Sequence, residues 1–91
     1  MVFMLKMLTF YGNRGYNRDM ENVYEKISSR LKEIRKDSGM SQKQLGDKLS
    51  LSQDTVSLWE NGKSLPNAEQ IVSLCELFGV SADYLLALSD Y

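Results

Sequence analysis

The 91-residue chain contains no histidine and a single cysteine, Cys75. Histidine is the commonest general base and the usual partner of serine and cysteine nucleophiles. One thiol without a histidine makes neither a zinc cluster nor an intrachain disulfide. We therefore expect no enzymatic activity, no metal and no cofactor. Cys75 is expected to serve as a small core residue, and the lack of a disulfide framework fits a reducing, cytoplasmic environment.

A strong excess of charge is also missing, because eleven basic residues face twelve acidic ones. The charges are distributed unevenly: residues 1–48 carry ten basic and six acidic side chains, whereas residues 49–91 carry Lys63 against six acids. Such a chain has little general attraction for a polyanion, so any binding to nucleic acid must depend on a local patch and on shape. The length suits one domain.

The first nineteen residues differ from the rest. Residues 1–11 are apolar apart from Lys6 and Thr9, and a glycine-containing break follows over 12–15. The apolar run is too short to cross a bilayer and lacks the features of a signal peptide, so we expect no membrane association. We interpret residues 1–19 as an N-terminal extension ahead of a domain over 20–91. The alternative is an arm that adds to a partner or to a dimer.

Helical signals fill the chain from residue 20 onward. Val23, Ile27, Leu31 and Ile34 recur at spacings of four, four and three, which places them on one helix face. Further along, four residues of the preferred N-cap types each precede a helical pattern: Ser41, Ser52, Asn67 and Ser81. These signals predict an all-α domain with five helices, over 21–38, 41–49, 52–60, 67–78 and 81–88.

The same periodicity predicts which apolar side chains form the core. They are Ile27, Leu31, Ile34, Leu45, Leu49, Leu51, Val56, Trp59, Ile71, Leu74, Leu77, Phe78, Leu85 and Leu86.

The second and third predicted helices are short and are separated by Ser50 and Leu51 alone. To share a core they must cross steeply, which is helix-turn-helix geometry. The third helix then turns its opposite face outward, and the residues on that face are Gln53, Asp54, Ser57 and Leu58. Glutamine can pair with adenine, aspartate can accept from cytosine and an apolar group can contact a thymine methyl. This face is therefore expected to read bases in double-stranded DNA.

Two of these residues have a simpler interpretation. Asp54 equally suits stabilisation of the helix N-terminus by a negative charge. Leu58 could be a lone exposed leucine, which is ordinary on a protein surface.

From Arg30 to Pro66 a set of residues occurs together in a fixed register: Ser41-Gln42, Leu45, Gly46, Leu49, Leu51-Ser52, Val56, Trp59-Glu60-Asn61-Gly62, Lys63 and Pro66. This set closely resembles the Cro and phage-repressor helix-turn-helix family, the lambda-repressor-like domains of the xenobiotic-response-element type. The resemblance covers residues 21–88 and implies a compact five-helix fold with the helix-turn-helix at the second and third helices. In one departure from the family pattern, Ser50 stands where glycine is usual, at a strain of about 1 kcal/mol if it is left-handed.

The resemblance also implies roles for individual positions. Gln42 is expected to bond a phosphate and to support the base-reading residues, while Asn61 and Lys63 meet the DNA backbone. The predicted backbone contacts are completed by Lys43, Ser52 and Thr55. In some relatives the positions of Arg35 and Glu60 carry an ion pair, which would orient the third helix here.

These observations predict a sequence-specific DNA-binding regulator, a repressor that binds a palindromic operator as a homodimer. The expected dimer surface is the fifth helix with the tail residues Leu86, Leu88 and Tyr91, since that end is apolar and remote from the base-reading face. Two alternatives remain open: an antitoxin or restriction-system controller of the same fold, and a protein-interaction module that has lost DNA binding.

Overall fold

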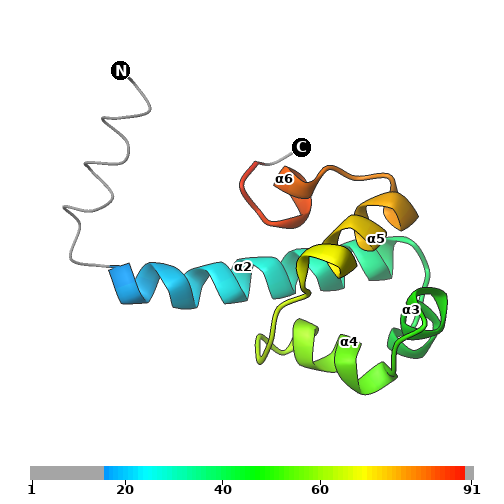
Figure 1. The fold of residues 1–91 in the computed structure, drawn as a ribbon. Coiled ribbons are helices and arrows are strands. Elements are labelled where there is room, and N and C mark those ends of the chain that lie inside the picture. The colour runs from blue at the N-terminus through cyan, green and yellow to red at the C-terminus, as the bar shows by residue number, and fades with distance from the viewer. Residues whose placement is uncertain (1–15, 90–91) are drawn as a thin grey trace.

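A computed structural model describes residues 16–89, with their side chains from residue 23 onward. This part of the chain forms five helices and no strand: α2 (Tyr16–Asp37), α3 (Gln42–Leu49), α4 (Gln53–Glu60), α5 (Ala68–Phe78) and α6 (Ala82–Leu85) (Figure 1). The predicted all-α, lambda-repressor-like fold is confirmed. Predictions that concern residues 1–15 and Tyr91 lie outside the described residues.

Side-chain caps define where α3 to α6 begin, at the four residues that the sequence indicates. The Ser41 hydroxyl accepts from the Gln44 N–H at 3.0 Å, and the Gln44 side chain accepts from the Ser41 N–H at 2.8 Å. A reciprocal pair of the same kind starts α5 at Asn67, while Ser52 and Ser81 cap α4 and α6. The caps satisfy N–H groups that have no partner within the helix.

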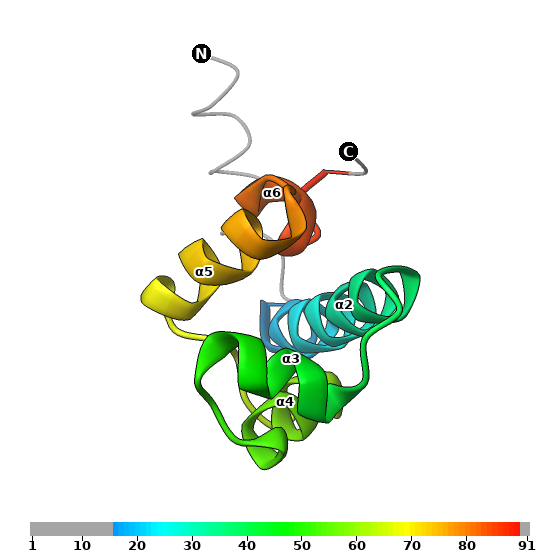
Figure 2. The same ribbon diagram turned by 90° about the vertical axis from the view of Figure 1, so that its right-hand side faces the viewer.

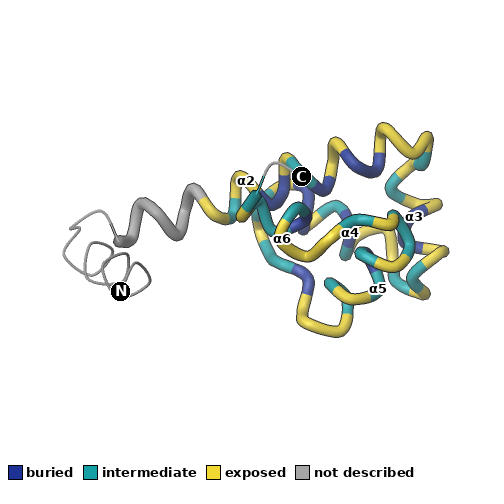
Figure 3. The backbone as a smooth tube through the Cα atoms, turned by 90° about the horizontal axis from the view of Figure 1, so that it is seen from above, coloured by how far each residue is buried: buried dark blue, intermediate teal, exposed yellow. Residues whose placement is uncertain are grey.

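One apolar core lies between the helices. The buried apolar side chains are Ile27, Leu31, Ile34, Leu45, Val56, Trp59, Leu74 and Leu85, all of them predicted. The other predicted core residues pack against this cluster while half-buried: Leu49, Leu51, Ile71, Leu77, Phe78 and Leu86. Figure 3 shows the buried positions on helix faces that turn toward one another.

The long helix α2 lies between α4 and α6. Helices α3 and α4 pack against each other, and α4 also packs on α2; α6 packs on α5 and on α2. In both Figure 1 and Figure 2, α4 and α6 lie on opposite sides of α2. Helix α4 is therefore remote from α6.

Helix α2 begins at Tyr16, five residues ahead of the predicted start. The prediction rested on the onset of the apolar stripe, but no glycine or proline lies between Tyr16 and Asp37 to end the helix earlier. Extending a helix whose packed part already exists adds one hydrogen bond for each residue fixed, which explains the longer element. The domain boundary at residue 20 remains a prediction.

Helix α6 contains four residues, fewer than the helix predicted over 81–88. Ala87 adopts a φ of 61°, in the left-handed region, and the Leu88 N–H donates to the Asp83 carbonyl at 2.8 Å. This closing pattern ends a helix as a glycine usually would. An alanine in a sequence does not indicate the end of a helix. The prediction from periodicity therefore made this helix too long.

Candidate nucleic-acid interface

The turn between α3 and α4 is built by a left-handed serine and a glycine. Ser50 has φ 59° and ψ 40°, and the N–H of Leu51 donates to the Gly46 carbonyl at 2.8 Å. A Cβ at Gly46 would lie 2.8 Å from the Leu51 carbonyl oxygen and 3.2 Å from that of Ser52. The chain thus doubles back against the helix it has just left, which fixes the position of α4 relative to α3.

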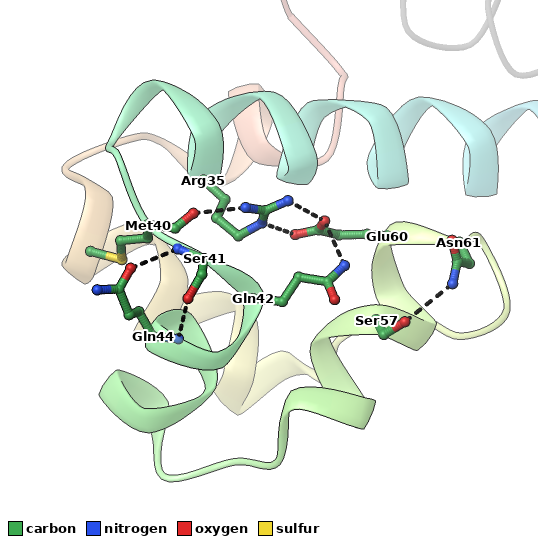
Figure 4. Close-up of polar contacts among 8 residues, drawn as sticks. All are labelled: Arg35, Met40, Ser41, Gln42, Gln44, Ser57, Glu60 and Asn61. Atoms are coloured by element: carbon green, nitrogen blue, oxygen red, sulfur yellow. Dashed lines mark hydrogen bonds and ion pairs between the residues drawn. The ribbon is translucent and has the colours of Figure 1, made fainter.

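A buried ion pair joins the end of α4 to α2. Arg35 donates to the two carboxylate oxygens of Glu60 from Nε at 2.6 Å and from Nη2 at 2.9 Å, and its Nη1 donates to the Met40 carbonyl at 2.7 Å (Figure 4). The side chains of Arg35 and Glu60 are 9% and 1% exposed. The hydrogen bond and charge of Glu60 raise the pKa of Arg35 more than burial lowers it. The ion pair that the resemblance implied is present.

Gln42, at the start of α3, is tied to the same ion pair. Its Nε2 donates to Glu60 Oε1 at 3.1 Å, which fixes the orientation of the amide (Figure 4). An amide nitrogen has two N–H groups, so one donor remains for another partner. The link between Gln42 and Glu60 was not predicted, because its partners are 18 residues apart and on different helices.

The four predicted base-reading residues lie on α4. Gln53 and Asp54 are exposed in its first turn, Leu58 is 47% exposed, and Ser57 is half-buried. The Ser57 hydroxyl accepts from the Asn61 Nδ2 at 3.2 Å. Its own O–H can still donate, and the side chains of this face combine an amide, a carboxylate, a hydroxyl and an apolar group.

The predicted backbone-contacting residues surround that face. Asn61 and Lys63 are exposed where the chain leaves α4, and the Lys63 N–H donates to the Leu58 carbonyl at 2.9 Å. At the other end of α4, the Ser52 and Thr55 hydroxyls lie 3.0 Å apart. The face is thus bordered by hydroxyl groups at the start of α4 and by an amide and a cation beyond its end.

Lys43 differs from the other predicted backbone contacts, because it pairs with Asp47 at 3.2 Å. Both of these side chains are more than half exposed, and such a pair is weak enough to open when a phosphate approaches.

The sequence interpretation missed the role of Arg30. No contact was assigned to its side chain, which is half-buried and donates to backbone carbonyls at the C-terminal end of the domain. Its position three residues after Ile27, on the packed face of α2, indicates burial, but backbone partners more than fifty residues away leave no mark in a sequence.

Two further observations concern metal ions and membranes. In the part of the chain that the structure describes, His, Cys, Asp and Glu do not gather into a group able to hold a metal ion. None of the described helices has the length and apolar character needed to span a membrane.

Comparisons with known proteins agree with this geometry. The chain belongs to the helix-turn-helix family, whose model matches residues 31–85. Relatives that the chain matches are named as HTH-type transcriptional regulators.

Its relatives include the HTH-type transcriptional activator BcrR of Enterococcus faecalis, 33% identical over 67% of this chain and 30% of that protein. The HTH-type transcriptional regulator ImmR of Bacillus subtilis is 35% identical over 70% of this chain and 50% of its own length. A prophage-derived regulator of the same bacterium, YonR, is 35% identical over 66% of this chain and 56% of its own length. The matched segment thus spans about half or less of these relatives. No solved structure shows significant similarity to the chain.

Proposed function

We propose that this protein is a repressor that binds a palindromic DNA operator as a homodimer. The observation that supports it best is the position of α4, which presents Gln53, Asp54 and Leu58 to solvent while Glu60 is buried against α2. A short helix held this rigidly suits the major groove, where base edges carry a distinct pattern of donors and acceptors. A helix-turn-helix family member with such a face is suited to reading sequence.

Base reading is assigned to Gln53, Asp54, Ser57 and Leu58. Backbone contacts are assigned to Gln42, Lys43, Ser52, Thr55, Asn61 and Lys63. Gln42 has a particular place among them, because its Glu60 bond sets the direction of its amide. We propose that the Arg35–Glu60 pair orients α4 and, through Gln42, also aligns the phosphate contact with the base-reading face.

Dimerisation follows from the small size of this surface. One α4 of eight residues offers too few base contacts for tight specific binding, whereas two copies one DNA turn apart read both halves of a palindrome. The C-terminal end lies on the other side of α2 from α4, so two copies can associate there while both α4 helices face DNA (Figure 1, Figure 2).

Repression is the simplest outcome of such binding, because a dimer seated on a promoter excludes polymerase without any further contact. Activation is the second candidate, and the observation in its favour is that the relative BcrR is named an activator. The two differ in where the operator lies relative to the promoter.

Selection of bound duplexes from a random pool tests the proposal. We expect an enriched site with two-fold symmetry whose half-sites are about 10 base pairs apart. The selected site is then placed over a promoter and, in a second template, upstream of it. Transcription reduced only on the first template supports repression, and transcription increased on the second supports activation. A pool without enrichment, together with no binding to random duplex at low salt, would instead favour the protein-interaction module.

A further inference from the structure

A side-chain hydrogen bond joins two polar residues at the C-terminal end of α4. The Asn61 Nδ2 donates to the Ser57 hydroxyl oxygen at 3.2 Å, and the two side chains point toward one another in Figure 4. The backbone joins the same two residues, because the Asn61 N–H donates to the Ser57 carbonyl at 2.9 Å. Asn61 is thus attached to Ser57 through both its backbone and its side chain.

The position and orientation of Asn61 are set by its neighbours in the chain. The side chain of Glu60, the preceding residue, is 1% exposed in its ion pair with Arg35, and Gly62 turns the chain away from α4 at a φ of 71°. As the C-cap of α4, Asn61 lies at the negative end of the helix dipole. That end favours the amide orientation in which the nitrogen, and not the oxygen, faces back toward Ser57.

The accepted bond directs the proton of the Ser57 hydroxyl away from the protein. A serine within a helix commonly donates to a carbonyl of the preceding turn, as Ser28 of α2 does to Glu25 at 3.0 Å. In the part of the chain that the structure describes, the Ser57 hydroxyl makes no such bond. Accepting from Asn61 also polarises its O–H, which makes it a better donor. The pair therefore presents a hydrogen-bond donor on the base-reading face.

A donor held in this way discriminates between bases. A serine hydroxyl that rotates freely can donate or accept, so it suits every base edge. In the major groove the edge of guanine offers two acceptors, N7 and O6, whereas cytosine offers only the N4 donor. A cytosine at this position would bring its N4–H toward the Ser57 O–H and the Asn61 N–H, so that donors face one another.

We infer that Asn61 is a positioning residue for base recognition: it holds the Ser57 hydroxyl as a donor, so that Ser57 selects guanine over cytosine at one position of a half-site. This inference rests on the proposed function, in which α4 reads the operator, and it adds the base that one side chain selects. Asn61 keeps its second N–H for the backbone contact assigned to it.

The test is titration of the full chain on operator duplexes that carry a G·C pair or the reversed C·G pair at the position read by Ser57. That position is the one at which Ser57→Ala relaxes the selected sequence. Wild type should bind the two duplexes with affinities that differ at least about fivefold. Asn61→Ala frees the hydroxyl to rotate and should reduce this ratio to about twofold or less. Each variant is compared with itself, so a loss of folded protein cancels in the ratio.

Asn61→Asp is the sharper variant, because an ionised carboxylate has nearly the same shape as the amide but can only accept. The carboxylate would accept the Ser57 proton and leave the hydroxyl to accept from the base, so the preferred duplex should be the reversed one. Such a reversal also shows that the wild-type hydroxyl donates. Lys63→Gln is the matched control, because it changes the net charge by the same amount; it should weaken binding to both duplexes and preserve their ratio.

In the Ser57→Ala background, Asn61→Asp should no longer change the ratio, because Asn61 acts through Ser57. A ratio that Asn61→Ala and Asn61→Asp leave as in wild type would overturn the inference while sparing the proposed function. An operator at which Ser57→Ala relaxes no position would do the same. A wild type that enriches no duplex from the random pool would overturn the proposed function, and the inference with it.

Discussion

Two opposite charges, those of Arg35 and Glu60, are buried together where α2 meets α4. Desolvation makes such a pair a poor source of stability, but removing one partner leaves the other as an uncompensated buried charge. The pKa of Arg35 is raised in the folded state, so its stabilising effect is complete below the unfolded-state pKa and is lost only as the pH rises through the folded-state value. Changes of pH near neutrality therefore leave the charge of Arg35, and with it the ion pair, unchanged.

Glu60→Gln should lower the free energy of unfolding by about 3 kcal/mol, because Arg35 loses its counter-charge inside the protein. The matched control is Asp47→Asn, which breaks the exposed pair with Lys43 and should cost less than about 0.5 kcal/mol. Urea unfolding measures both. A loss below about 1 kcal/mol for Glu60→Gln would show that the pair does not hold α4.

Ser50 and Ala87 are the non-glycine residues with positive φ in the described part of the chain. Ser50→Gly should raise the free energy of unfolding by about 0.5–1 kcal/mol, because glycine adopts this conformation without a Cβ clash. Ser38→Gly, at an exposed position with negative φ, is the control and should be neutral or destabilising. Thermal unfolding of both variants measures the two changes in stability. Equal changes at the two sites would contradict the strain assigned to Ser50.

Side-chain roles were predictable from the sequence where a motif fixed them, and not where distant backbone groups are the partners. The caps are local, because Ser41 and Gln44 satisfy each other within one turn. The bond from Gln42 to Glu60 and those from Arg30 to Tyr84 and Ser89 depend on how helices pack. No spacing rule covers such contacts.

At the scale of the elements, the turn between α3 and α4 depends on a close approach of backbone to backbone. The Gly46 Cα faces the carbonyls of Leu51 and Ser52, so any side chain there must displace the turn. Since α4 follows immediately at Gln53, a displaced turn would also shift the proposed base-reading face.

Gly46→Val should lower the free energy of unfolding by about 2 kcal/mol through overpacking against backbone that cannot move away cheaply. Lys48→Val, at an exposed position of the same helix, is the control for the helix propensity of valine and should cost no more than about 0.7 kcal/mol. Denaturant unfolding of both variants gives the comparison. Equal losses would mean that the turn tolerates a larger residue.

The interior helices were predicted more accurately than the two ends of the fold. Helices α3, α4 and α5 have strong signals at their starts, and their periodicity reflects real burial. Helix α2 started too late in the prediction, because the apolar stripe was followed rather than the glycine-containing break over 12–15 that directly precedes Tyr16. Helix α6 ended too late in the prediction, because no glycine or proline marks its end in the sequence. Their actual limits come from helix propagation and from the turn at Ala87.

At the scale of the whole molecule, the domain over 20–91 is proposed to carry both DNA binding and dimerisation. The buried apolar residues of the described side chains begin at Ile27, well inside that range. Residues 1–19 are proposed to be an extension that neither function requires.

A chain starting at Met20 should therefore melt within about 2 °C of the full chain, because losing the first turn of α2 removes no fully buried apolar contact among the described side chains. Its dimer constant and operator affinity should also match. Calorimetry, sedimentation and DNA titration measure the three quantities. Loss of dimerisation in the shorter chain would show that the N-terminal segment is an arm.

The measurement that tests sequence reading by α4 most directly is DNA titration of Gln53→Ala and Lys63→Ala on a selected operator and on random duplex. Gln53→Ala should weaken operator binding by about 1–3 kcal/mol and leave random duplex nearly unaffected, because a base contact is lost without a change in charge. Lys63→Ala should weaken binding to both and lower the salt slope by about one. Equal losses on both duplexes for Gln53→Ala would contradict the assignment of α4 as the base-reading helix.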